Sequence, residues 1–286
     1  MLFLCIAALI AWIGVLLLPW QPHRARERLE ARLETGDDAL ADVTVLITAR
    51  DEAATIGLTI AALGRQGRAL DVVLVDDQSD DGTAAAAREA AAAPGSPALR
   101  VVSGAPLAAG WAGKLWALEQ GLAAIDRPFV LLLDADIELA PGMLPALLRR
   151  ARESSAALVS IMAELRCVTR WEKLLSPAFV FFFKLLYPFA LSNDPARRTA
   201  AAAGGCILAR TAELRAIGGF AAIRGALIDD CTLAAKIKAN GKRTWIGMSH
   251  SVRSLRAYPT LGDFWQMVSR TAFTQLRYSL GWLLVA

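Results

Sequence analysis

The feature that most restricts the fold of this chain is an alternation of short apolar segments with longer segments of helical spacing. Apolar or β-branched runs bounded by turn residues are typical of strands, and apolar residues three or four positions apart are typical of helices. Strands that alternate with helices of about 10 to 15 residues imply crossover connections and a mostly parallel sheet. We therefore expect an α/β fold, with strands at 43–48, 72–75, 99–102, 129–133 and 158–161 and helices at 52–66, from 83, at 114–125 and at 232–240.

Acidic residues directly follow two of these expected strands. Asp76 and Asp77 come after the second strand, and Asp134-Ala135-Asp136 comes after the fourth. The carboxyl ends of parallel strands share one edge of a sheet, where ligands bind in such folds. Two carboxylates two residues apart can share a hard cation, since Mg²⁺ and Mn²⁺ prefer oxygen ligands and bind through one or two carboxylates plus substrate phosphates. We expect both acidic pairs in one cleft, although acids are common wherever strands end.

Three other segments carry polar residues at expected loop positions. The first joins the first strand to the first helix and contains Arg50 and Glu52. The second, Gly110-Trp-Ala-Gly-Lys114, ends in a lysine that can neutralise a phosphate. The third leads from a glycine pair to Asp229 and Asp230 at the start of a helix. Each also has an ordinary structural interpretation, because acids complement the dipole in a first helical turn and Asp, Ser and Gly favour turns.

Together and in this order, the segments resemble the family 2 inverting glycosyltransferases over about residues 43–247. The family pattern has a strand that ends near N-E, then V-D-D-x-S-x-D-G-T, D-x-D, and G-G-F before an acidic pair. The chain is also similar to a narrower group, the hopene-associated glycosyltransferases related to ceramide glucosyltransferases, at 110–118, 201–206, 226–231 and 270–278. This resemblance implies a GT-A nucleotide-sugar-binding fold, in which a mixed, mostly parallel sheet is flanked by helices.

The resemblance also implies a role for each matching residue. Asp77, with Asp76 behind it, would contact the nucleobase; Asp134 would reach the ribose or the metal; and Asp136 would bind Mg²⁺ or Mn²⁺ directly. Asp230 would be the general base that takes the proton of the acceptor hydroxyl, while the metal offsets charge on the leaving diphosphate. Asp229 is the alternative base, because the pair reads Asp-Asp where the family usually has Glu-Asp. The expected donor-binding residues are Arg50, Glu52, Asp76, Asp77, Lys114 and Asp134.

Several residues late in the chain have two interpretations. The motif (Q/R)-x-x-R-W of processive members is absent from the sequence, since the nearest match is Gln275-Leu-Arg277-Tyr278, which disfavours a polysaccharide synthase. Arg277 would contact either the diphosphate or a membrane surface. His250, expected past the last strand, would be either a surface histidine or a third metal ligand. Trp111 and Trp116 would either stack on a sugar or pack internally.

The N-terminal segment predicts a membrane anchor. The stretch from Leu2 to Trp20 contains no charged residue and is long enough to span a bilayer. Four arginines follow at Arg24, Arg26, Arg28 and Arg32, which places the rest of the chain in the cytoplasm by the positive-inside tendency. A signal peptide fits poorly, because no basic residue precedes the apolar run and no small-residue cleavage site follows it. A hydrophobic fraction of 55% and a mean hydropathy of +0.41 also favour contact with lipid.

The expected organisation is an anchor at 1–20, a juxtamembrane linker at 21–41, a catalytic domain at 42–250 and an amphipathic membrane-interface segment at 251–286. The apolar segment 174–191 is as long as a membrane span. It falls between Asp136 and Asp230, which must share a compartment, so an interfacial or re-entrant helix fits better than a span. A buried core helix is the alternative. The segment from Lys242 to Arg277 contains six basic residues and one acid, a composition that favours binding to an anionic membrane surface. No motif supports nucleic-acid binding.

These patterns predict a membrane-associated inverting glycosyltransferase at the inner (cytoplasmic) membrane, with its catalytic domain facing the cytoplasm. It would transfer a sugar from a nucleotide-diphosphate donor, a UDP-sugar by resemblance, to a lipid hydroxyl such as that of a hopanoid. A polyprenyl-phosphate glycosyltransferase and a catalytically silent sugar-nucleotide-binding membrane protein are the alternatives. Four scattered cysteines and two histidines exclude a His/Cys zinc cluster and a disulfide framework.

Overall fold

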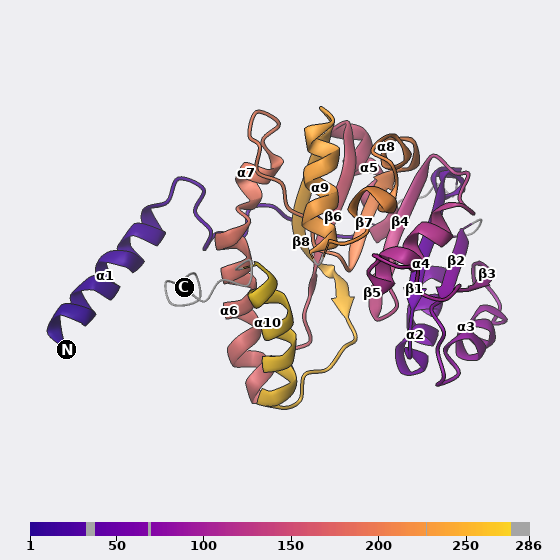
Figure 1. The fold of residues 1–286 in the computed structure, drawn as a ribbon, viewed down its shortest axis with the longest axis horizontal. Helices are drawn as coiled ribbons and strands as arrows, with labels where there is room; N and C mark the ends of the chain where they lie inside the picture. The colour runs from indigo at the N-terminus through magenta and orange to yellow at the C-terminus, as the bar shows by residue number, and fades with distance from the viewer. Residues whose placement is uncertain (33–37, 68–69, 227, 276–286) are drawn as a thin grey trace.

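The computed structural model describes residues 1–32, 38–67, 70–226 and 228–275 (Figure 1). At its centre these residues form a mixed sheet with strand order β3-β2-β1-β4-β7-β6-β8-β5. The strands are β1 Val43–Ala49, β2 Asp71–Asp76, β3 Ala98–Ser103, β4 Phe129–Asp134, β5 Ile137–Leu139, β6 Ala156–Glu164, β7 Cys206–Arg210 and β8 Arg243–Ser254. The helices are α1 Leu2–Leu17, α2 Ala53–Gly64, α3 Thr83–Ala91, α4 Gly113–Leu122, α5 Met143–Glu153, α6 Arg170–Leu186, α7 Phe189–Asn193, α8 Thr211–Ala216, α9 Asp229–Ala239 and α10 Leu261–Gln275, with short 3₁₀ turns η1 Asp38–Asp42 and η2 Phe220–Ile223.

The order of the strands places the acidic motifs at one edge of the sheet. Strands β3, β2, β1 and β4 are parallel, and β1 pairs with β2 on one side and with β4 on the other. After β1 the chain adds β2 and β3 on one side of this strand, and then adds β4 on its other side. The strand order therefore reverses at β1, and open α/β sheets bind ligands at such a switch point. In the register, Ala49 lies opposite Asp76 and Thr48 lies opposite Asp134. Beyond β4, the antiparallel strand β7 makes the sheet mixed.

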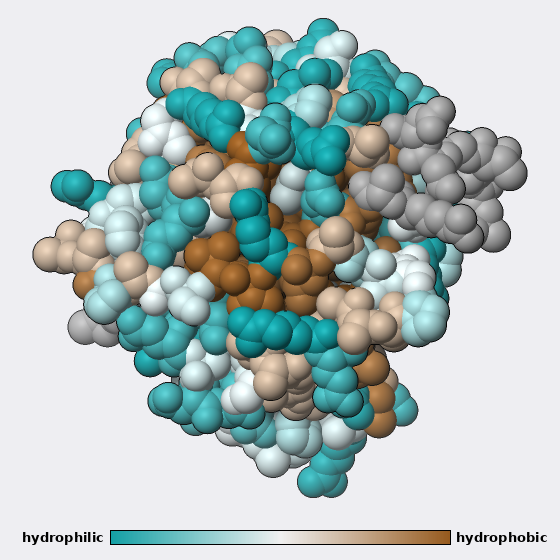
Figure 2. Space-filling view, turned by 90° about the vertical axis from the view of Figure 1, so that its right-hand side faces the viewer, coloured by the Kyte–Doolittle hydropathy of each residue, from teal (hydrophilic) through white to brown (hydrophobic). Residues whose placement is uncertain are grey.

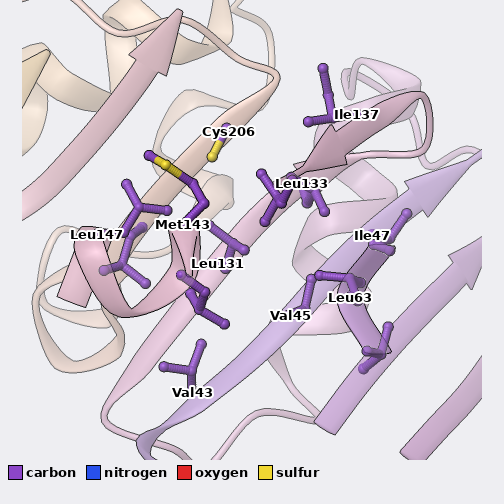
Figure 3. Close-up of a cluster of buried hydrophobic side chains, with 14 of the residues drawn as sticks. Val43, Val45, Ile47, Leu63, Leu131, Leu133, Ile137, Met143, Leu147 and Cys206 are labelled. Carbon is purple, nitrogen blue, oxygen red and sulfur yellow. The ribbon is translucent and has the colours of Figure 1, made fainter. Parts of the chain in front are cut away.

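Both faces of the sheet are covered, which explains why its central strands are continuous apolar runs rather than alternating ones. On one face, Val43, Val45 and Ile47 of β1 pack with Leu131 and Leu133 of β4 against helices α2 and α5 (Figure 3). On the other face, Leu46, Val73 and Val130 pack against α4, α8 and α9. Figure 2 shows the side of the molecule near β3 and α3, where hydrophilic residues surround a hollow with hydrophobic residues at its centre.

All five strands expected from the sequence are present, and helix α9 begins earlier than expected, at Asp229. The segment 174–191 forms the second part of α6, then a break, and then the start of α7. The side chains of Leu174, Phe182 and Leu186 are exposed on α6, so this helix is not a buried core helix. Helix α10 lies beside α6, away from the main sheet (Figure 1).

The apolar N-terminal segment forms α1, a helix of 16 residues. A helix rises about 1.5 Å per residue, so α1 is shorter than the roughly 30 Å hydrocarbon core of a bilayer. Among the residues that the structure describes, no helix combines the length and apolarity needed to cross a membrane. The transmembrane anchor expected at 1–20 is therefore not confirmed.

Candidate active site

A cleft of about 680 Å³ opens at the carboxyl edge of β1, β2 and β4. Its walls also include the start of α4, residues 203–205 before β7, the start of α9, and residues that follow β8. The cleft brings together most of the residues predicted from the sequence, which are Arg50, Glu52, Asp77, Lys114, Asp134, Asp136 and Asp230.

The loops that follow β1 and β2 hold each other in place through side-chain bonds to backbone amides. The amide of Asp51 donates to Ser79 Oγ at 3.0 Å, and the amide of Glu52 donates to Thr83 Oγ1 at 2.8 Å. The amide of Ala53 donates to Asp81 Oδ2 at 2.9 Å. The polar residues of the second loop thus act mainly as structural supports for the first, which positions Glu52 in the cleft.

The two adjacent acids after β2 have different surroundings. Asp77 lines the cleft, and its backbone amide donates to the carbonyl of Ala49 at 2.8 Å. A Cβ atom at Gly113 would lie 3.5 Å from Asp77 Oδ2, so the glycine leaves space beside this carboxylate. Asp76 is not among the residues that line the cleft, and its Oδ1 accepts from the amide of Ser79 at 3.2 Å. Asp77 is therefore the acid available to a ligand, and Asp76 supports the turn behind it.

Asp134 and Asp136 each face one cation. Lys114 Nζ lies 2.6 Å from Asp134 Oδ1, and Arg256 Nε lies 3.0 Å from Asp136 Oδ2. Asp136 is only 8% exposed, so its carboxylate is largely shielded from solvent. Burial lowers the pKa of Lys114, but the charges of Asp134, Asp229 and Asp230 outweigh that effect and raise it. Lys114 is therefore a permanent cation between the D-x-D carboxylates and the acids that open α9.

Arg256 is a cleft residue that the sequence interpretation did not identify. Its guanidinium bridges Asp136 and Glu52, and the backbone amide of Leu255 donates to the carbonyl of Asp136 at 2.7 Å. The strand before it, β8, runs to Ser254 and so passes the expected domain boundary at 250. The only sequence signal for Arg256 is the basic character of 242–277, which by itself predicts a membrane contact rather than a cleft residue.

Glu172 anchors the segment that follows Arg256. It is fully buried, caps α6 together with Thr169, and accepts from the amides of Val168 at 2.9 Å and Tyr258 at 2.8 Å. Burial raises the pKa of Glu172, but these amide donors outweigh burial and lower it to about 2. The carboxylate thus joins the start of α6 to Tyr258, which lines the cleft.

Replacing Glu172 by Gln should therefore lower stability by about 1–3 kcal/mol, because bonds from amides to a charged acceptor are lost. A carboxyl whose folded pKa is depressed contributes its stability above its unfolded pKa of about 4.5, and loses it as the pH falls towards 2. Thermal unfolding of both forms should give a melting-temperature difference that is large at pH 6, declines below about pH 4.5 and becomes small only near pH 2. A difference that does not change with pH would contradict this role.

A divalent cation fits the D-x-D pair if it takes further ligands from a substrate. No group of three or more Asp, Glu, His or Cys side chains that could hold a metal occurs among the described residues. Mg²⁺, however, usually binds through one or two carboxylates plus phosphate oxygens. Asp134 and Asp136 offer such oxygens in the cleft and already attract one cation each. They are the residues that would hold the metal.

Asp230 is the acid that α9 presents to the cleft. Its Oδ1 accepts from the amide of Cys231 at 2.7 Å, and a Cβ atom at Gly204 would lie 3.4 Å from its Oδ2. Burial and the charge of Asp229 raise the pKa of Asp230 to about 6, although Lys114 and backbone donors partly oppose this. Asp229 lines a smaller adjoining cavity with Lys114, outside the main cleft. The geometry therefore favours Asp230 over Asp229 as a proton acceptor.

The glycine pair before α9 has a structural role. The amides of Phe220 and Ala221 donate to Glu119 Oε2 at 2.8 and 3.2 Å. Gly219 has a φ of +62°, and a Cβ atom there would lie 2.9 Å from the same oxygen. Glu119 of α4 thus fixes the turn that leads to Asp230. We did not predict Glu119, because nothing in its local sequence distinguishes it from a solvated helix acid.

Other residues with two interpretations lie outside the cleft lining. His250 is within β8 rather than past the last strand; it is exposed, and its Nδ1 lies 2.9 Å from Glu164 Oε1. Trp116 Nε1 donates to the carbonyls of Ala105 and Pro106, and its ring packs on Trp111 at a centroid distance of 5.1 Å. Arg277 lies outside the described residues.

Comparison with known proteins relates this cleft to sugar transfer. Residues 41–272 match the family model described as glycosyltransferase like family 2. A curated relative is the undecaprenyl-phosphate 4-deoxy-4-formamido-L-arabinose transferase of Edwardsiella ictaluri (strain 93-146), 37% identical over 93 residues. The match covers 32% of this chain and only 27% of that relative, so the chain matches about a quarter of the relative's length.

Two solved structures illustrate the shared fold. A mannosyltransferase from Pyrobaculum calidifontis, in complex with GDP-Man and Mn²⁺, has a TM-score of 0.65 and 24% identity over 95% of this chain and 72% of its own. Glucosyl-3-phosphoglycerate synthase from Mycobacterium tuberculosis, in complex with Mn²⁺ and UDP-glucose, has a TM-score of 0.52 and 20% identity over 88% of this chain and 87% of its own. At these identities the likeness establishes the GT-A fold. Because the family match spans most of the chain and contains every acid that lines the cleft, this protein belongs to glycosyltransferase family 2 and is a glycosyltransferase.

Proposed function

We propose that this protein is an inverting glycosyltransferase that moves a sugar from a nucleotide-diphosphate donor to a lipid acceptor at a membrane surface. The observation that carries the proposal is the convergence into one cleft of Asp77, the D-x-D pair Asp134 and Asp136, and Asp230, which come from three separate segments of the chain. The presence of all four carboxylates in one cleft also argues against a catalytically silent protein.

In the proposed donor complex, Asp77 accepts a hydrogen bond from the nucleobase, and Lys114 and Arg256 face the diphosphate. Arg50 and Glu52 line the same part of the cleft. We propose UDP as the nucleotide, with GDP as the alternative, since the two structural neighbours were solved with UDP-glucose and with GDP-Man. Mg²⁺ or Mn²⁺ on Asp134 and Asp136 would offset the charge that builds on the leaving diphosphate.

Removing the metal should therefore abolish transfer. We expect EDTA to stop transfer of a radiolabelled sugar, and Mn²⁺ or Mg²⁺ in excess over EDTA to restore it. Lys114 and Arg256 cannot replace the metal fully, because each is already paired with a carboxylate of the site. Full activity in EDTA would contradict the assignment of Asp134 and Asp136 as metal ligands.

The raised pKa of Asp230 gives the reaction a characteristic acid limb. A general base works in its deprotonated form, and the pKa of Asp230 is raised from 3.8 to about 6. We expect kcat/KM to fall tenfold per pH unit below about pH 6, and not only below pH 4 as for an ordinary aspartate. The negative charge of Asp229 is one of the causes that raise the pKa of Asp230. Asp229→Asn removes this charge, so the fall of kcat/KM with decreasing pH should begin at a lower pH.

The proposals of a lipid acceptor and of a membrane location are based on exposed apolar surface. Much of α1 is exposed and apolar, and α6 and α10 expose Leu174, Phe182, Leu186, Leu261 and Trp265. Exposed apolar side chains on neighbouring helices are typical of a surface that contacts lipid or a partner. With the arginines after α1, this supports a location at the cytoplasmic face of the inner membrane.

Two lipid classes are candidate acceptors. A neutral hydroxyl lipid such as a hopanoid is suggested by the narrower sequence resemblance. A polyprenyl phosphate is favoured by the curated relative, whose name includes undecaprenyl phosphate. Isolated membranes or purified protein should be incubated with radiolabelled UDP- and GDP-sugars and with each lipid class. Label in the organic-extractable fraction supports the proposal, and transfer only to water-soluble acceptors would overturn it.

A further inference from the structure

Helix α6 separates the donor cleft from a second cavity. Phe179 and Phe183 of this helix line the donor cleft. On its other side, between α6 and residues 22–30, lies a cavity of about 340 Å³. The residues of α6 that line it form one helical stripe, at positions i, i+1, i+4, i+5 and i+8: Ser176, Pro177, Val180, Phe181 and Lys184.

The wall of this second cavity is mainly apolar, and most of its charged groups are already paired. Glu30 accepts from Ser249 Oγ and Ser251 Oγ, and Glu164 pairs with His250. Lys184 is 5% exposed; it donates to the carbonyl of Arg24, and its Nζ lies 3.7 Å from Glu27 Oε2. His23, Arg24 and Arg28 also line the cavity, so it combines an apolar wall with basic side chains from the segment that follows α1.

One buried polar atom in the wall has no partner among the described residues. Ser176 is 3% exposed and lines the cavity, yet its Oγ makes no hydrogen bond. A buried hydroxyl without a partner costs free energy, typically about 1–3 kcal/mol in proteins. The Ser176 hydroxyl is thus the one buried polar group of the wall that the described residues leave without a hydrogen bond.

The second cavity adjoins the donor cleft. Met162, Ala163 and Leu165, at the end of β6, line both of them. At the outer side, the ring of Phe181 stacks on Trp12 of α1 at a centroid distance of 5.9 Å. The cavity thus lies between the exposed apolar side of α1 and the place where sugar transfer is proposed.

We propose that this second cavity binds the hydrocarbon chain of the acceptor lipid, whose hydroxyl or phosphate end reaches over Met162 and Ala163 into the donor cleft. The inference rests on the proposed function and names the part of the site that recognises a lipid. A volume of about 340 Å³ is within the range of small-molecule sites, roughly 300–1,000 Å³, and accommodates part of a long chain. The rest of the chain would lie along α1 and α6.

The test uses the full-length protein and two photoreactive lipids, farnesyl phosphate and farnesol, each with a diazirine at the end of the chain. After irradiation, the labelled peptides are mapped by mass spectrometry. We expect label on residues 22–30 or on the stripe of α6, and loss of label with excess unmodified lipid. Equal labelling by both lipids shows recognition of the chain alone, and stronger labelling by the phosphate points to a polyprenyl phosphate; both results support the site.

A variant that fills the cavity is matched with the same kind of change elsewhere on the surface. Val180→Trp fills the cavity and should reduce labelling and raise the acceptor KM about tenfold, the equivalent of displacing roughly two buried methylenes. Leu58→Trp, at an exposed position of α2 outside both cavities, should change neither. The donor KM should stay constant in both. If Val180→Trp does not fold, Val180→Ser, which adds a hydroxyl to the apolar wall, should weaken labelling in the same direction.

The outcomes separate this inference from the proposed function. If sugar is transferred to lipid but label is found only on the exposed faces of α1 or α10, and Val180→Trp leaves the acceptor KM unchanged, the cavity assignment is wrong and the function stands. If farnesyl phosphate labels the cavity but no lipid accepts sugar, the cavity assignment stands and the proposed function is wrong.

Discussion

Asp230→Asn is expected to reduce sugar transfer by about 10²–10⁴-fold while donor binding stays close to that of the unmodified protein. The amide keeps the size of the side chain and can still accept from the amide of Cys231, but it cannot take a proton. The variant should also be as stable as the original protein or more stable at pH 7.5. A carboxyl whose folded pKa is raised costs stability above that pKa, and this cost disappears with the charge.

The measurements are kcat, donor binding by calorimetry, and thermal unfolding of the same preparations. Asp229→Asn is the matched control, because it makes the same chemical change one residue earlier, outside the main cleft. It should retain much more activity than Asp230→Asn. If Asp229→Asn is the less active variant, Asp229 is the general base. If both variants are fully active, neither acid of α9 is the general base.

Asp136→Asn is expected to lower kcat/KM by about 100-fold or more, through weaker binding of the metal and the diphosphate. The side chain is nearly buried two residues after β4 and lines the cleft, where it is one of the two carboxylates of the D-x-D pair. The apparent affinity for Mn²⁺, measured from the activity as a function of metal concentration, should fall with the activity.

Two control variants distinguish the role of Asp136 in metal binding from its role in the ion pair with Arg256. Glu138→Gln makes a similar change two residues further along, where the acid pairs with Arg65 outside the cleft, and should have little effect. Arg256→Gln removes the cation that faces Asp136 and leaves the carboxylate in place. It should weaken donor binding but keep the metal requirement. An Asp136→Asn variant with unchanged Mn²⁺ dependence would show that Asp136 does not bind the metal.

The first half of the fold could be predicted because its strands are buried on both faces. Strands β2 and β4 are apolar runs, β1 is a mostly β-branched run with two threonines, and each ends at a polar turn that marks its carboxyl end. Their parallel order followed from the helices between them, and it placed Asp77 and Asp134 at one edge. The acids of α9 were assigned to the same cleft only through the family pattern.

The second half was harder to predict, because its elements depend on distant partners. Strand β5 has three residues, too few for a pattern, and β8 contains polar residues that are satisfied by Glu30. Arg256 lies 120 residues from Asp136 and 204 from Glu52 in the sequence, so its role depends on the path of the chain after β8. Glu119 likewise acts on a turn about 100 residues away.

The anomeric configuration of the glycolipid product tests the central claim most directly. A single displacement with Asp230 as general base inverts the configuration, so an α-linked nucleotide sugar should give a β-linked lipid, as measured by the anomeric coupling constants in NMR spectra. An α-linked product would indicate retention, which requires a different mechanism from the one proposed for this cleft.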